Sequence, residues 1–183
     1  TTTGTKNVAV GTEALDQNST GSQNTAVGYL SLERNTTASN NTAVGNSALE
    51  ENTTGTENTA VGSSCLDANT TGNYNTAVGS QSLGNSTGSE NTAVGRAALN
   101  ANTSASHNTA VGYNALLDNT TGTKNTAFGS LALDANTTAD FNTAVGYGAL
   151  SDNTTGAQNT AVGVGALGVN TSGGFSVAIG YNA

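Results

Sequence analysis

The chain has 183 residues, of which 34% are hydrophobic and 9% are charged, and its net charge is −8. This negative balance argues against nucleic-acid binding, which normally requires a basic stripe. Disordered chains usually combine low hydrophobicity with many charges and prolines, whereas this chain has few charges and no proline. The composition therefore indicates an ordered chain with a thin core.

A short motif, Asn-Thr-Ala-Val-Gly, returns along the whole chain at steps of 17 residues, with a single step of 16. Its copies begin at Asn7, Asn24, Asn41, Asn58, Asn75, Asn91, Asn108, Asn125, Asn142, Asn159 and, in altered form, Ser176. The period is too short for a helical hairpin repeat and too long for a heptad, and it suits one coil of a β-solenoid. We predict an all-β fold, a parallel β-solenoid or β-roll of about eleven 17-residue coils, as one repeat-array domain over residues 1–183.

Each repeat opens with an extended segment in which alternate side chains face opposite ways. The Thr slot, which is Val8 and Val177 in two copies, shares a face with the Val slot. Because Val replaces Thr without disturbing the pattern, we predict that this face points into the coil. The Asn, Ala and Gly slots share the other face, which we expect to be smooth and to pack against a neighbouring subunit.

The Ala-Leu segment that follows is predicted as a second strand-like stretch, with Leu as the main core residue and a tightly packed small residue before it. Asn-Thr-Thr-Gly is then a turn. Ala38, Ala105 and Ala139 replace its glycine, so a positive φ is not required there. The short unit lacks one residue between Leu83 and Asn85, at the turn entrance.

The predicted core is thin. Coils about 4.8 Å apart would form a rod on the order of 50 Å long, and each would bury only a few modest side chains. That burial scarcely offsets the entropy lost when a whole coil is ordered. We therefore expect backbone ladders, stacked Asn side chains and oligomerisation, with three chains around one axis, to supply the remaining stability.

Ser176-Val177-Ala178-Ile179-Gly180 and Asn7-Val8-Ala9-Val10-Gly11 resemble the strand motif Asn-Ser-Val-Ala-Ile-Gly of trimeric autotransporter adhesin heads. The longer arrays of Asn-Thr-Ala-Val-Gly followed by Ala-Leu are also similar to those of phage and bacterial tail-fibre proteins. The resemblance implies a left-handed, trimeric β-roll on a bacterial surface or a virion tail fibre, which binds cells or matrix. The repeat departs from the 14-residue adhesin repeat in its longer turn arm, and the choice between adhesin and tail fibre stays open.

No set of residues typical of an enzyme, a cofactor site or a metal site is present. Cys65 occupies the small slot before Leu66, and His107 lies in a variable slot. We therefore predict no catalytic residue, cofactor or metal. Eight acids share one stretch of the repeat, which we interpret as a solvated edge rather than a calcium site: Asp16, Glu33, Glu50, Glu51, Asp67, Asp118, Asp134 and Asp152.

The chain has no initiator Met, no signal peptide and no apolar run long enough to cross a bilayer. We therefore expect a segment of a longer extracellular fibre protein, without direct membrane insertion.

Two sets of residues are candidates for modification or binding. The second Asn of each unit matches the glycosylation pattern Asn-x-Ser/Thr, although a stacked turn explains it as well; these residues are Asn18, Asn35, Asn52, Asn69, Asn85, Asn102, Asn119, Asn136, Asn153 and Asn170. Aromatic side chains flank the strand at its corners and could bind sugars or proteins, or simply cover coil edges: Tyr29, Tyr113, Tyr147 and Tyr181 on one side, and Tyr74, Phe141 and Phe175 on the other.

The sequence thus predicts a non-enzymatic structural or adhesive fibre segment that is homotrimeric and presents a binding surface to a host-cell or matrix receptor or a surface glycan. The alternative is a monomeric β-solenoid that binds ice or carries glycans. Regular rows of Thr suggest ice binding, but the predicted inward direction of the strand Thr side chains speaks against it.

Overall fold

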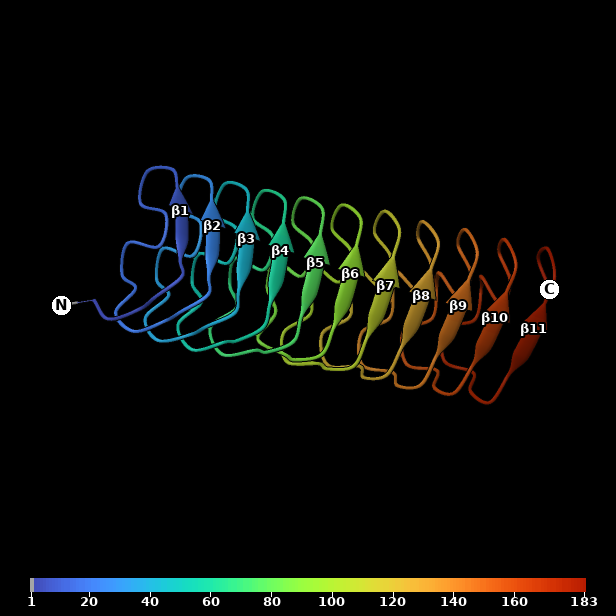
Figure 1. Ribbon diagram of the computed structural model, residues 1–183. Coiled ribbons are helices and arrows are strands. Elements are labelled where there is room, and N and C mark those ends of the chain that lie inside the picture. The colour runs from blue at the N-terminus through green and yellow to red at the C-terminus, as the bar shows by residue number, and fades with distance from the viewer. Residues whose placement is uncertain (1) are drawn as a thin grey trace.

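The computed structural model describes residues 2–183, which wind into a slender rod built on one parallel β-sheet (Figure 1). The sheet has 11 strands in the order of the chain, so each strand pairs only with the strands of the preceding and following coils. The strands are β1 (Val8–Val10), β2 (Thr25–Val27), β3 (Thr42–Val44), β4 (Thr59–Val61), β5 (Thr76–Val78), β6 (Thr92–Val94), β7 (Thr109–Val111), β8 (Thr126–Phe128), β9 (Thr143–Val145), β10 (Thr160–Val162) and β11 (Val177–Ile179). The predicted parallel β-solenoid is confirmed.

Identical slots of successive repeats are stacked along the rod. Thr25 pairs with Thr42, Ala26 with Ala43 and Val27 with Val44, and the same register continues from strand to strand. Backbone bonds outside the strands also link neighbouring coils, as from the amide of Leu32 to the carbonyl of Ala48 at 3.0 Å. Every coil is therefore held by the coil before it and the coil after it.

The strand side chains face the opposite way from the sequence prediction. From β2 to β10 the central Ala is fully buried, and the Asn that precedes each of these strands is 0–1% exposed. The flanking Thr and Val side chains point outward. The interior is narrow, and only Ala leaves room opposite the Leu side chain. A single chain thus buries its own alanines, and the expected subunit contact on the Ala/Gly face is wrong.

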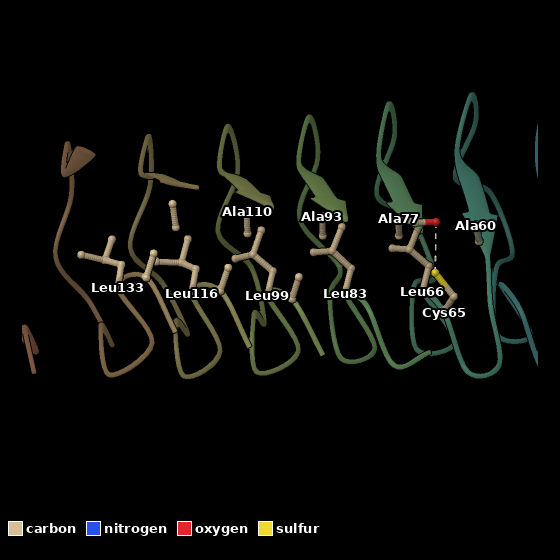
Figure 2. Packing of buried hydrophobic residues seen from close by; sticks show 14 of the residues in the cluster. Ala60, Cys65, Leu66, Ala77, Leu83, Ala93, Leu99, Ala110, Leu116 and Leu133 are labelled. Carbon is tan, nitrogen blue, oxygen red and sulfur yellow. Dashed lines mark hydrogen bonds between the residues drawn. The ribbon is translucent and has the colours of Figure 1, made fainter. Parts of the chain in front are cut away.

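The core is a row of leucines that face the strand alanines (Figure 2). The slot before the Leu is small in every coil, as predicted, and it is fully buried from the second coil onward: Ala in several coils, and Ser31, Cys65 or Ser82 in others. Ala14 in the first coil is partly buried. The polar members of this slot donate to strand carbonyls of the next coil. Cys65 Sγ lies 3.2 Å from the Ala77 oxygen, and Ser82 Oγ lies 3.0 Å from the Ala93 oxygen.

Each coil turns at corners where non-glycine residues adopt positive φ. They are the Leu slot, the slot two residues before it and the slot before the strand Asn, for example Leu49 at 53°, Ser47 at 52° and Asn40 at 62°. The Ala-Leu segment is therefore a turn, and the prediction of a second strand is wrong. These corners were not predictable from the sequence, because most of their residue types are not the ones that usually adopt positive φ. Left-handed φ is unfavourable for L-residues by roughly 1–2 kcal/mol.

Glycine is required at the end of each strand. These glycines have φ between 131° and 144°, and a Cβ on Gly28 would lie 2.2 Å from the carbonyl oxygen of Gly45 in the next coil. The turn glycines differ, because neither Gly55 nor Gly72 has a positive φ. This confirms that the turn does not require a positive φ at this position.

Two rows of buried Asn side chains run along the rod. In the row of strand Asn residues, Asn58 Oδ1 accepts from the Asn75 amide at 2.9 Å, and Asn58 Nδ2 donates to the Gly72 carbonyl at 2.8 Å. In the row of turn Asn residues, Asn52 Nδ2 donates to Asn35 Oδ1 at 3.0 Å and to the Gly55 carbonyl at 2.9 Å. These ladders satisfy polar groups that burial would otherwise leave unpaired.

Candidate interaction surfaces

The outward face of the sheet is uniform and carries no charge. Its two columns contain only Thr and Val, apart from Phe128 in β8 and Ile179 in β11. Val61 and Val94 are 38% and 36% exposed, and Phe128 is 56% exposed. Contiguous apolar surface of this kind is typical of an interaction site.

The predicted partner-binding aromatics form two separate rows rather than one patch. Tyr29, Tyr113 and Tyr147 directly follow the glycine that ends a strand, whereas Tyr74 and Phe141 lie two residues before a strand begins. All five side chains are about half exposed. The strand face therefore has an aromatic row along each edge, interrupted by polar residues.

Cations from the preceding coil contact two of these rings. The Arg96 guanidinium lies 5.7 Å from the centre of the Tyr113 ring, and Lys124 Nζ lies 5.0 Å from the centre of the Phe141 ring. Such contacts stabilise the ring orientation by about 0.5–1 kcal/mol at exposed sites. The rings have one face covered by a cation and are otherwise accessible.

The structure buries most of the predicted glycosylation sites. Eight of the ten are at most 8% exposed and belong to the ladder of turn Asn residues: Asn18, Asn35, Asn52, Asn69, Asn102, Asn119, Asn136 and Asn153. A glycan on Nδ2 would replace one of the two N–H donors that this atom uses in the ladder, and it has no space inside the coil. The glycan interpretation is therefore wrong at these positions. Asn170 continues the ladder with partial exposure. The constancy of this residue in the repeat was the available signal, because an exposed slot would tolerate substitution.

Asn85 differs from the other nine because the short coil shifts the register of its turn. Ser86, and not Asn85, occupies the ladder slot: it is fully buried, and its Oγ accepts from Asn102 Nδ2 at 2.8 Å. Asn85 is exposed and takes the place that Ala68 has in the preceding coil. The missing residue therefore falls after Ser86, inside the turn, and the predicted deletion between Leu83 and Asn85 is wrong.

The acidic residues line one edge, as predicted, but several are half-buried. Burial raises the pKa of Asp67, and repulsion from Glu50 and Glu51 raises it further. Burial likewise raises the pKa of Asp134, with the charges of neighbouring Asp side chains adding to the effect. Among residues 2–183, no group of three or more His, Cys, Asp or Glu side chains could hold a metal ion.

Cys65 and His107 both have local partners. Cys65 is buried in the small slot, and loss of hydration raises the pKa of its thiol to about 12. His107 Nδ1 lies 3.0 Å from Glu90 Oε2 on the exposed surface of the neighbouring coil. Within the described part of the chain, no helix is long and apolar enough to span a membrane.

Comparison of the chain with protein-family models, with curated proteins and with solved structures gives no match.

Proposed function

We propose that this chain is a non-enzymatic segment of an extracellular fibre, in which three copies pack together and present a binding surface to cells or matrix. The supporting observation is the outward strand face, which is uncharged along every coil and carries a column of Val, Phe128 and Ile179 side chains that are half-exposed or exposed. The expected oligomer contact thereby moves from the Ala/Gly face to the Thr/Val face.

The strand face supplies a large part of the area that stable association needs. A three-residue strand is about 10 Å wide and eleven coils extend for about 50 Å, which gives on the order of 500 Å² of flat sheet before the flanking rows are added. A stable interface needs about 800 Å² from each partner. The strand face together with the row that contains Tyr74 and Phe141 approaches that scale, and a three-fold arrangement offers each chain two neighbours. The row that contains Tyr29, Tyr113 and Tyr147 then stays outside the contact.

The resemblance to trimeric autotransporter adhesin heads and to tail-fibre repeats supports a trimer and an extracellular location. In an adhesin or a tail fibre, a uniform rod holds binding residues at regular intervals and exposes them. The half-exposed tyrosines beside the strand face supply aromatic surface for a receptor or glycan. We assign the chain to this class of bacterial-surface or virion fibre proteins.

Light scattering of the purified chain tests the oligomer. We expect the mass of three chains, and we expect the variant Val61→Lys/Val94→Lys to be monomeric because it places charges in the apolar face. The matched control Thr54→Lys/Thr121→Lys adds the same charges to exposed turn positions and should remain trimeric. A monomeric parent, or a Val61→Lys/Val94→Lys variant of unchanged mass, would contradict the proposal.

The outward Thr side chains also favour a second function, ice binding. The strand Thr and Val side chains form regular columns of hydroxyl and methyl groups, spaced by about 4.8 Å along the rod and about 6.7 Å along the strand. The inward direction that spoke against this alternative is not observed. Ice binding requires a monomer whose strand face is open to solvent. Thermal hysteresis in a monomeric sample would therefore favour ice binding over the fibre function.

A further inference from the structure

The short coil opens a polar notch that interrupts the uniform surface. The notch has a volume of about 180 Å³ and is lined by Ser64, Asp67, Gln81, Gly84, Asn85 and Asn100. None of these residues belongs to a strand, so the notch lies off the Thr/Val face and remains open when that face is covered.

The notch exists because Gly84 has no side chain in a slot that is usually filled. This slot directly follows the core Leu and holds Asp67 in the preceding coil and Asn100 in the following coil. A Cβ on Gly84 would lie 2.8 Å from Asn100 Nδ2, 3.4 Å from Asp67 Oδ1 and 3.5 Å from the Gln81 carbonyl oxygen. Three polar atoms therefore line the wall of the notch beside Gly84, and Asn100 Nδ2 lies so close that a side chain at Gly84 would displace it.

Two amide side chains of the notch are held in fixed orientations. Asn100 Nδ2 donates to the Gln81 carbonyl at 2.8 Å, and Asn85 Nδ2 donates to the Asn100 carbonyl at 3.0 Å. Because a carbonyl oxygen only accepts, each amide must turn its nitrogen to that partner. Each keeps an Oδ1 acceptor and a second N–H donor for a ligand, at little further entropic cost.

We propose that this notch binds one uncharged terminal sugar residue of a glycan. Sugar hydroxyls both donate and accept, which matches the carboxylate, amide and hydroxyl groups that line the notch. A cation would require oxygen ligands alone, whereas the amide nitrogen of Asn100 lines the notch beside Gly84. The volume equals that of about six waters at ~30 Å³ each, which suits a single pyranose ring.

Charge limits which sugars fit. Asp67 lies in the notch, and Glu50 and Glu51 of the preceding coil are close enough to act on its carboxyl group. Arg34 pairs with Glu51 at 2.6 Å and leaves Glu50 and Asp67 uncompensated. Anionic sugars such as sialic acid and uronic acids are therefore repelled, and neutral sugars are selected. This inference deepens the proposed fibre function by naming a ligand class for its surface.

Saturation-transfer NMR on the whole chain tests the notch with the methyl glycosides of galactose, glucose, mannose, fucose and N-acetylglucosamine. We expect transfer to at least one of these, and none to sialic acid. Gly84→Leu should weaken binding by about tenfold or more, because its side chain fills the space. Leu117 occupies the same slot two coils further on, and in the Gly84→Leu variant the Asn100 side chain must move to admit the new Cβ.

Ser151→Leu is the matched control, because it introduces the same Leu side chain in this slot of a distant coil, and it should bind as the parent does. Asp67→Asn keeps the shape, removes the charge and should also weaken binding, which covers the case of a Gly84→Leu variant that fails to fold. Binding that survives both variants, absence of transfer to every glycoside, or binding of Ca²⁺ or sialic acid instead would overturn the proposal. A trimer that binds no sugar would refute the notch alone, whereas a monomer that binds sugar would refute the trimeric fibre alone.

Discussion

Removal of one strand Asn from the middle of the rod should be far more costly than the same change at its end. In Asn58→Ala the Asn75 amide loses its acceptor at 2.9 Å, and the Gly72 carbonyl keeps only its bond from Asn69 Nδ2. An unpaired buried amide costs about 1–3 kcal/mol and a lost hydrogen bond about 0.5–1.5 kcal/mol. The free energy of unfolding should therefore fall by about 2–4 kcal/mol.

Asn7→Ala is the matched control, because Asn7 makes the same two bonds, to the Gly21 carbonyl and from the Asn24 amide, in a half-buried setting. Water can replace the amide there, and we expect a loss below about 1 kcal/mol. Urea unfolding at one fixed chain concentration measures both values, since oligomerisation would otherwise shift the midpoint. Equal losses in the two variants would refute the role assigned to the buried ladder.

Three further predictions concern the surface and the titrating groups. Tyr113→Ser/Tyr147→Ser should reduce cell or glycan binding without lowering the melting temperature, because both rings are about half exposed; unchanged binding would exclude them as receptor contacts. Cys65 should react with a thiol reagent at pH 8 only after unfolding, because burial raises its thiol pKa to about 12; rapid labelling of the folded chain would contradict its placement. Asp134→Asn should raise the melting temperature at pH 7, and this gain should disappear as the pH falls toward about 4. The pKa of Asp134 is higher in the folded chain than in the unfolded chain, so the ionised carboxyl group lowers the stability of the folded chain once the pH exceeds the unfolded pKa. A gain in melting temperature that does not depend on pH would refute this origin.

The coil period was predictable from the sequence because stacking forces equal lengths. Each slot must lie above its copy in the preceding coil, as Thr42 lies above Thr25, so the chain repeats at the length of one turn. The core Leu and the small residue before it were predictable for the same reason: a buried slot restricts volume, and the variation from Ala48 to Cys65 stays within it.

Hydrophobicity did not predict which side chains of the strand face the interior. A rule that places Val inside and Asn outside fails here, because the interior opposite Leu66 accepts only Ala and because buried Asn side chains pair with one another. The corners were hidden for another reason: residues such as Leu49 and Glu57 adopt positive φ only because the ladder bonds around them hold it. The notch was not predictable for a third reason: only the stacking of the coils shows that Ser86 replaces Asn85 in the ladder, which places Gly84 in the same slot as Asp67 and Asn100.

The coil-to-coil ladder has a mechanical consequence for a rod anchored at both ends. A pull along its axis acts along the bonds between neighbouring coils, such as that from the Thr42 amide to the Asn58 carbonyl at 2.8 Å, and loads one coil at a time. Each 17-residue coil that peels away would release about 55 Å of extended chain. The tether would lengthen in small, repeatable steps under load, and the remaining coils would serve as the template for rewinding when tension falls.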